Sequence, residues 1–222
     1  MSTSDMADLT ITPVPGIQSQ PTSAILAGHL RDRVVEGTFA PGAQLNEARI
    51  AGEFQVSRGP VREALQRLVQ EGLLESRRNR GVFVRELTEE DAAEIFAARE
   101  VLECAAAAVI AAKPAQERAA IASALSSVVS DLNAAIANGD DAKALRLDHE
   151  FHSRFVQSAG NSRLARAYAT IATESLICSA HSVGVHPPLG DFSAHHEALV
   201  SLTERGDIEG IHAAVHQHLS HH

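Results

Sequence analysis

Between residues 21 and 86, short apolar stripes alternate with tight turns. Apolar side chains recur every three or four positions in the segments 21–37, 47–54 and 57–70, the spacing of helices that bury one face. Two short apolar runs follow, separated by five polar residues that include three arginines, and this pattern predicts a hairpin. The order helix, helix, turn, helix, hairpin is that of a winged helix-turn-helix domain.

The remainder of the chain, residues 87–222, carries longer helical patterns separated by Gly, Pro and Asn residues. We expect helices at residues 88–112, 114–137, 140–158, 161–182, 191–205 and 207–220. Successive helices without an internal repeat favour an antiparallel bundle. The sequence therefore predicts a mainly α protein, in which a winged helix-turn-helix domain (21–86) precedes an all-α antiparallel six-helix bundle (87–222).

The N-terminal segment and the cysteines indicate where the protein acts. Residues 1–20 lack the basic start and apolar core of a secretion signal, and we expect them to form a disordered polar tail. Cys104 and Cys178 lie far apart inside helical patterns, which is typical of buried thiols in a reducing compartment. No apolar run is judged long enough to cross a bilayer. These features predict a cytoplasmic protein without a membrane segment.

The charge of the chain is unevenly distributed. The formal net charge is −9, yet residues 57–85 contain seven arginines and only three acidic residues. From residue 88 onward, nine basic residues face eighteen acidic ones. A basic patch beside an acidic body is the electrostatic pattern of a regulator that contacts nucleic acid on one face.

Three polar side chains share one face of the helix predicted at 57–70. Arg58, Arg62 and Gln66 recur every four residues, and the opposite face is apolar. Arginines at the start of such a helix can contact guanine in the major groove or bind phosphates, and Ser57 with the first free amides also suits phosphate. The alternative is an ordinary helix with a solvated arginine face.

The loop of the predicted hairpin is a second candidate for DNA contact. Arg77, Arg78 and Arg80 lie within four residues, where we expect few partners within the folded chain. Gly81 would allow the backbone to approach a ligand closely. This loop could reach the minor groove adjacent to the major groove that the helix at 57–70 would contact.

The segment LNEARIAGEFQVSRGPVREALQRLVQEGLLESRRNRGVFV closely resembles the DNA-binding domain of GntR-family regulators, whose pattern runs VSRxPVREALxxLxxEGLL and ends in RGxxV. The resemblance implies that Arg58 and Arg62 are the recognition-helix arginines and that Gly81 is the wing-tip glycine. Ala48 is a departure, because some members place a phosphate-contacting arginine there. The next residue is an arginine, but it points about 100° away around a helix.

Four potential metal ligands lie on the apolar faces of three predicted helices. Asp148 and His152 are spaced i, i+4 on one helix, and His196 and His218 lie on the last two. An unpaired buried aspartate is costly, and one divalent metal would satisfy all four groups. Such ligands suit Zn²⁺ above all, and also Ni²⁺, Mn²⁺ or Fe²⁺. Two alternatives stay open: each histidine alone could be a hydrogen-bonded core residue, and His195 competes with His196.

Residues 88–220, with EIFAAREVLE in the first helix and a later D-x3-H…H…H series, resemble the FCD effector domain of the FadR subfamily, and six helices are typical of its VanR-like branch. The resemblance implies a small organic acid bound at the metal, a homodimer, and Arg99 facing the effector cavity. The alternative role for Arg99 is a salt bridge with Glu103. The metal ligands implied by the resemblance are Asp148, His152, His196 and His218.

These observations predict a metabolite-responsive repressor rather than an enzyme. Two winged helices of a homodimer would bind a pseudo-palindromic operator in double-stranded DNA, and a small carboxylate effector would release it. One alternative is a metal-free regulator of the same family that senses a larger ligand such as an acyl-CoA. Another is a metal-dependent hydrolase, for which the sequence offers no identifiable general base.

Overall fold

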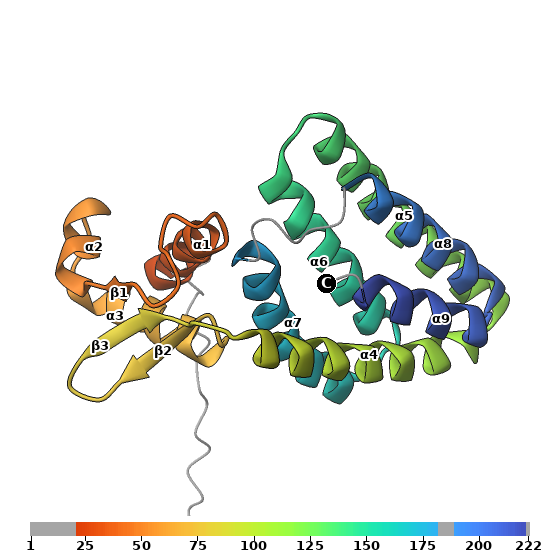
Figure 1. Cartoon of the computed structure of the whole chain (residues 1–222), viewed down its shortest axis with the longest axis horizontal. Helices are drawn as coiled ribbons and strands as arrows, with labels where there is room; N and C mark the ends of the chain where they lie inside the picture. Colours follow the sequence, from red (N-terminus) through yellow and green to blue (C-terminus); the bar gives the residue numbers. More distant parts are fainter. Residues whose placement is uncertain (1–20, 182–188, 221–222) are drawn as a thin grey trace, which may run out of the picture.

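The computed structural model describes residues 21–181 and 189–220, so the expected tail at 1–20 and most of the loop expected around residues 184–190 lie outside the described residues. Within them the chain forms nine helices and three short strands. Figure 1 shows two lobes: a small one with the strands, and a larger one of helices. The mainly helical fold with an N-terminal wing is therefore confirmed.

The small lobe is a winged helix-turn-helix. Its core is formed by apolar residues from all three helices and the hairpin, among them Leu30, Ile50 and Leu65. The chain turns between the second and third helices at Gln55, whose φ is 54°. Its elements are α1 (Thr22–Val35), β1 (Gln44–Leu45), α2 (Glu47–Glu53), α3 (Arg58–Gln70), β2 (Leu74–Arg77) and β3 (Gly81–Val84).

The sheet of this lobe has one strand more than the sequence pattern indicates. Its order is β1-β3-β2 with antiparallel pairs, and β1 pairs Gln44 with Phe83 and Leu45 with Val82. Two residues are too few to show the alternation by which strands are recognised. The extra strand ties the segment before α2 to the hairpin and so fixes the position of the wing.

The large lobe is a bundle of six helices within the described residues, and each begins and ends within three residues of its expected position. Thr88 and Asp91 form a capping box at the start of the first, and the Asn161 side chain accepts hydrogen bonds from two amides of the fourth. The helices are α4 (Glu89–Ala111), α5 (Ala115–Ala137), α6 (Asp141–Ser158), α7 (Ser162–His181), α8 (Leu189–Arg205) and α9 (Ile208–Leu219).

The bundle packs around α4 and α6. The helix α4 continues from the wing and lies against α7 and α9, while α5 packs between α6 and α8. Contrary to the expectation from the sequence, α5 is long and apolar enough to cross a membrane, judged by its length and composition only. One face of α5, which includes Leu125, Val128 and Leu132, is buried against the bundle.

Neither Cys104 nor Cys178 forms a disulfide. Cys178 is buried on α7, as expected, but Cys104 is only half-buried on α4. Burial raises the pKa of each thiol to about 11, so both are protonated at neutral pH and react slowly with alkylating reagents.

Candidate functional site

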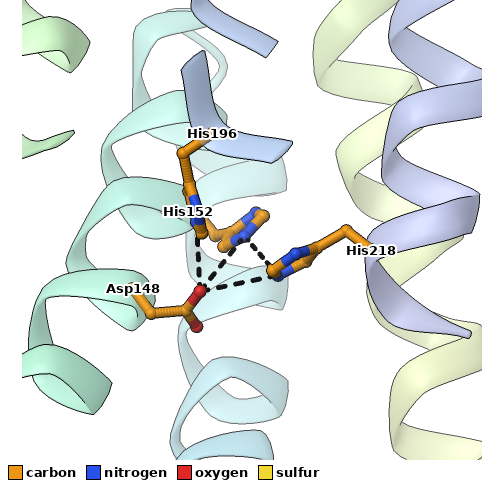
Figure 2. Close-up of side chains that lie close together, drawn as sticks. All are labelled: Asp148, His152, His196 and His218. Atoms are coloured by element: carbon orange, nitrogen blue, oxygen red, sulfur yellow. Dashed lines mark hydrogen bonds and ion pairs between the residues drawn. The ribbon is translucent and has the colours of Figure 1, made fainter. Parts of the chain in front are cut away.

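The four predicted metal ligands meet in the core of the bundle. All are buried, and one potential ligand atom from each lies within 4.8 Å of the others. Figure 2 shows the three imidazoles directed at a single carboxylate oxygen. The distances from Oδ1 of Asp148 to the Nε2 atoms are 3.0 Å for His196, 3.5 Å for His218 and 3.9 Å for His152.

Three helices supply these side chains. Asp148 and His152 are one turn apart on α6, His196 comes from α8, and His218 comes from the last turn of α9. The competing residue His195 is half-buried, and its ring centroid lies 6.0 Å from that of His218. Adjacent helical residues point about 100° apart, so only His196 faces the cluster.

Glu103 on α4 fixes the orientation of His152. Its Oε2 lies 2.7 Å from Nδ1 of His152, so Nδ1 carries a proton that it donates to Glu103, and Nε2 is the nitrogen that faces the cluster. Carboxylates commonly hold metal-binding histidines in this way. From the sequence, Glu103 is identifiable only as a partner of Arg99, because no sequence pattern joins residues 49 positions apart.

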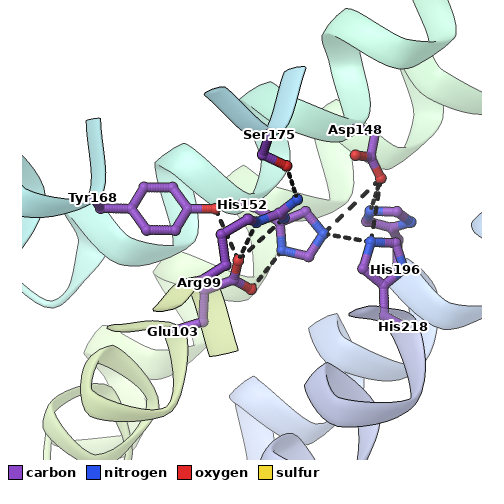
Figure 3. A network of polar contacts seen from close by, with 8 residues as sticks. All are labelled: Arg99, Glu103, Asp148, His152, Tyr168, Ser175, His196 and His218. Atoms are coloured by element: carbon purple, nitrogen blue, oxygen red, sulfur yellow. Dashed lines mark hydrogen bonds and ion pairs between the residues drawn. The ribbon is translucent and has the colours of Figure 1, made fainter. Parts of the chain in front are cut away.

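Arg99 is fully buried next to this carboxylate. Its Nε donates to Glu103 at 3.1 Å, and its Nη1 donates to Oγ of Ser175 at 2.6 Å. The Tyr168 hydroxyl donates to the same Glu103 oxygen at 2.8 Å. Figure 3 shows one continuous polar network from Tyr168 through His152 to the cluster. The salt bridge considered for Arg99 is thus present, whereas Tyr168 and Ser175 carry no signal in the sequence.

Charge is balanced inside this network. Burial alone would raise the pKa of Glu103, but the charges of His152 and Arg99 lower it to about 2. Burial would also raise the pKa of Asp148, but the His196 contact and the neighbouring imidazoles hold it well below its usual range. Both carboxylates are therefore ionised at neutral pH.

The donor set fits a divalent metal. With bond lengths of about 2.1 Å, the ligands around a tetrahedral ion lie about 3.4 Å apart, and the distances within the cluster are comparable. The Nε2 atoms of His152 and His218 are only 3.0 Å apart. Because the Nδ1–H of His152 donates to Glu103, the two Nε2 atoms face each other with a lone pair on at least one of them. A cation between them would use that lone pair.

The predicted DNA-contacting side chains of α3 lie on its exposed face. Arg58, Arg62 and Gln66 are exposed, and Arg62 pairs with Glu47 of α2 at 3.1 Å. Ser57 occupies the N-cap position as expected, but its side chain makes no capping hydrogen bond. Its hydroxyl is thus not used within the helix.

The wing differs from the expectation at one position. Arg78 and Arg80 are exposed near the tip, but Arg77 belongs to β2, pairs with Glu75 at 2.6 Å and stacks on Phe83. The expectation that Arg77 has few partners is therefore wrong, because its side chain contacts Glu75 on β2 and the ring of Phe83 on β3. Gly81 has a φ of 101°, which favours glycine.

A groove lies between the start of α3, the segment of β1 and α2, and the start of β3. It has a volume of about 310 Å³, and its lining includes Arg58 of α3, Ala48 of α2 and Gly81 of the wing. Arg49, beside Ala48, is exposed. The fold thus brings one residue from each predicted DNA-contacting segment, Arg58 and Gly81, to the same groove.

Comparison with known proteins agrees with this architecture. The family model for bacterial regulatory proteins of the gntR family matches residues 22–84, and that for the FCD domain matches residues 94–221. The chain is 31% identical over 206 residues to a probable D-xylose utilization operon transcriptional repressor of Paenarthrobacter nicotinovorans, covering 90% of this chain and 88% of the relative.

Two further relatives are similar to this chain. It is 34% identical over 136 residues to an uncharacterized HTH-type transcriptional regulator, YdhC, of Bacillus subtilis, a match covering 61% of this chain and 59% of YdhC. The crystal structure of a GntR regulator from Rhodococcus sp. RHA1 superposes with a TM-score of 0.72 at 26% identity, covering 89% of this chain and 93% of that one.

The fold defines a DNA-binding regulator with a second, helical domain. The chain belongs to the GntR family of bacterial regulatory proteins and is a transcriptional regulator that combines its helix-turn-helix domain with an FCD domain.

The Glu103 carboxylate should contribute to stability in a pH-dependent way. Its pKa is about 2 in the folded protein and near 4.3 when unfolded, so its contribution is present above pH 4.3 and is lost as the pH falls toward 2. In metal-free protein, Glu103→Gln should lower the free energy of unfolding by about 3 kcal/mol at neutral pH. Urea unfolding of both proteins at several pH values measures this difference.

The matched control is Glu94→Gln, which changes an exposed carboxylate on the same helix. It should have little effect at any pH. A deficit in Glu103→Gln that stays constant as the pH falls below 4 would contradict an ionised Glu103.

Proposed function

We propose that this protein is a repressor whose DNA binding is released when a small carboxylate binds a divalent metal in its helical domain. The observation that carries this proposal is the buried cluster of Asp148, His152, His196 and His218. The name of the Paenarthrobacter relative supports a repressor of a catabolic operon. A regulator of this kind acts in the cytoplasm, where bacterial DNA is found.

The metal would be held by the Asp148 carboxylate and the Nε2 atoms of the three histidines, and Zn²⁺ suits this donor set best. Ni²⁺, Mn²⁺ or Fe²⁺ would also accept it. When bound, the ion supplies a positive centre that can accept oxygen ligands. Glu103 favours the His152 tautomer that such a centre needs, because it accepts a hydrogen bond from Nδ1–H.

The charge of the site favours an anionic effector. Asp148 and Glu103 carry two negative charges and Arg99 carries one positive charge, and imidazoles must be neutral to bind a metal. Adding a divalent cation gives a net charge of about +1 in a buried volume. A carboxylate would neutralise this charge, and Arg99 could bind it bidentately. A neutral or cationic ligand would leave it uncompensated.

A homodimer is supported by an apolar face of α4. Val101 and Val109 are exposed large hydrophobic residues, with 68% and 40% of their surfaces accessible. Ala97, Ala105 and Ala108 are also exposed and extend this face along the helix. A second copy packed here would bury the stripe and place two winged helices side by side for a pseudo-palindromic operator.

The two alternatives receive less support. A larger ligand such as an acyl-CoA needs a large apolar cavity. The cleft of about 730 Å³ at the junction of the lobes is lined by residues such as Leu87, Phe96 and Cys178, and none of the four clustered ligands lines it. A hydrolase needs a general base beside a metal-bound nucleophile, but Glu103 is already occupied by His152, Arg99 and Tyr168.

The exposed face of α3 should read the operator. Replacing Arg58 or Arg62 with alanine should raise the operator Kd roughly 5- to 150-fold if the side chain contacts a base, and should affect non-specific DNA less. Arg67→Ala is the control, because Arg67 lies in the last turn of the same helix and pairs with Glu71. Fluorescence anisotropy on both DNAs measures the effect. Wild-type operator affinity in both variants would show that α3 is not the recognition helix.

The wing tip should contribute through phosphates. Arg78→Ala/Arg80→Ala should reduce the slope of log Kd against log salt by about one for each phosphate that the wing no longer binds. Arg77→Ala should leave the slope nearly unchanged, because Arg77 already pairs with Glu75. A titration of DNA binding against salt concentration provides both slopes. If the double variant keeps the wild-type slope, the tip lies away from DNA.

The clustered ligands should bind one metal ion per chain. Tag-free protein should contain stoichiometric metal by mass spectrometry, and Asp148→Ala/His152→Ala should lose it. His195→Ala is the matched control and should retain metal, since His195 lies outside the cluster. Affinity should fall as the pH drops below about 6.5, because imidazole must be neutral to bind.

Operator binding, measured on the same variants, distinguishes a loss of the effector response from a loss of DNA binding. His152→Ala should lose both the metal and the effector response, but its winged helix should still bind the operator. Stoichiometric metal in the double variant would rule out this ligand set. Loss of metal with a persistent effector response would leave the site structural.

A further inference from the structure

One side of α7 packs against the DNA-binding domain. Ile177 is buried in the apolar core of the small lobe, together with residues of α1 and α3. Three residues earlier, Glu174 forms an ion pair with Arg85, which directly follows the wing strand β3. Figure 1 shows the end of α7 directed toward α1 at the junction of the lobes.

Glu174 also touches the joint between the recognition helix and the wing. A Cβ atom on Gly72 would lie 3.3 Å from Cγ of Glu174, so the glutamate side chain lies over this glycine. Gly72 has a φ of 84° and connects the end of α3 to β2. Through this contact and Arg85, a movement of Glu174 acts on both DNA-contacting elements.

The other side of α7 belongs to the polar network of the bundle. Ser175, the neighbour of Glu174, accepts the 2.6 Å hydrogen bond from Arg99, and Tyr168 donates to Glu103. Ser175 is 1% exposed, so water does not replace the bond when it breaks. As Figure 3 shows, Arg99 lies between Ser175 and the Glu103–His152 pair.

We propose that α7 transmits occupancy of the Asp148 cluster to the winged helix, with the Ser175–Arg99 hydrogen bond as its link to the bundle and the Glu174–Arg85 pair as its link to the wing. This inference rests on the proposed function of the cluster. A metal held by His152 stabilises the Glu103–Arg99–Ser175 series. A carboxylate that binds Arg99 competes with Ser175 for the guanidinium and loosens α7.

A second connection between the lobes allows a matched comparison. Arg146 of α6 donates to Glu36, at the end of α1, over 3.4 Å, and both side chains are substantially exposed. Although α6 carries two of the clustered ligands, this long exposed pair contributes little. Removing it with Glu36→Gln tests whether loss of any ion pair between the lobes abolishes the response to the metal, or only loss of the Glu174–Arg85 pair.

The reporter for the experiment is Cys178, which is buried on α7 next to Ile177 and lines the cleft between the lobes. Its rate of alkylation by iodoacetamide, followed by peptide mass spectrometry, measures how firmly α7 is held. Full-length tag-free protein is compared with one equivalent of Zn²⁺ and after chelation. Cys104, on α4, serves as an internal reference for stabilisation of the bundle.

In wild type and in Glu36→Gln, Zn²⁺ should slow the alkylation of Cys178 at least about fivefold, within the usual range of coupling between sites. Ser175→Ala and Glu174→Gln should each bind one Zn²⁺ and keep the wild-type response of Cys104. In both, the response of Cys178 should fall below about twofold. Glu174 lies at the boundary between the lobes, so its variant decides the outcome if Ser175→Ala does not fold.

The possible failures are distinguishable. If wild type binds no Zn²⁺, the proposed function is wrong and this inference falls with it. If Zn²⁺ binds but the Cys178 response is absent in wild type, or persists in both α7 variants, the metal site stands and α7 is not the transmitting element. A response that disappears only in Glu36→Gln would assign this role to α6 instead.

Discussion

Two ionised carboxylates in the core of a helical bundle are the constraint on which the structure of the FCD domain depends. An isolated charge in such a position is too costly to bury, so each must be surrounded by donors or by a cation. Glu103 is compensated by Arg99, Tyr168 and His152. Asp148 is compensated by imidazoles from three helices. The helices α4, α6, α7, α8 and α9 must therefore keep one relative arrangement.

The same arrangement gives the domain a way to respond. A purely apolar core would be at least as stable, because buried ion networks bring little net stabilisation. The polar centre instead makes the packing of the helices depend on what occupies it. Because α7 lies in both the polar network and the core of the small lobe, it joins the polar centre to the DNA-binding domain over a short distance, which is the basis of the proposed transmission.

Local periodicity determined most of what the sequence could predict. The bundle helices are 12 to 23 residues long, and their ends are marked by caps such as Thr88 and Asn161 and by breaks at Gly, Pro and Asn residues. The i, i+4 spacing also places Asp148 and His152 on one inward face. The two-residue strand β1 is not predicted because it is too short to show a pattern.

Interactions between distant parts of the chain could not be predicted in the same way. The bond from Arg99 to Ser175 spans 76 residues, and a serine inside a helix carries no signal of its partner. The sequence places Arg77 at an open tip because it does not show how the side chain folds back onto Phe83. The family resemblance supplied the ligand set as a hypothesis, and the packing of α8 placed His196 rather than His195 in the cluster.

The most direct test of the central claim is X-ray absorption at the metal edge of purified, tag-free protein. The cluster predicts a first shell of nitrogen and oxygen atoms at about 2.0–2.1 Å, with the outer-shell scattering of about three imidazoles and no sulfur. A shell containing sulfur, or one without imidazole scattering, would place the metal elsewhere. In that case the buried carboxylates and histidines would form only a structural hydrogen-bond network.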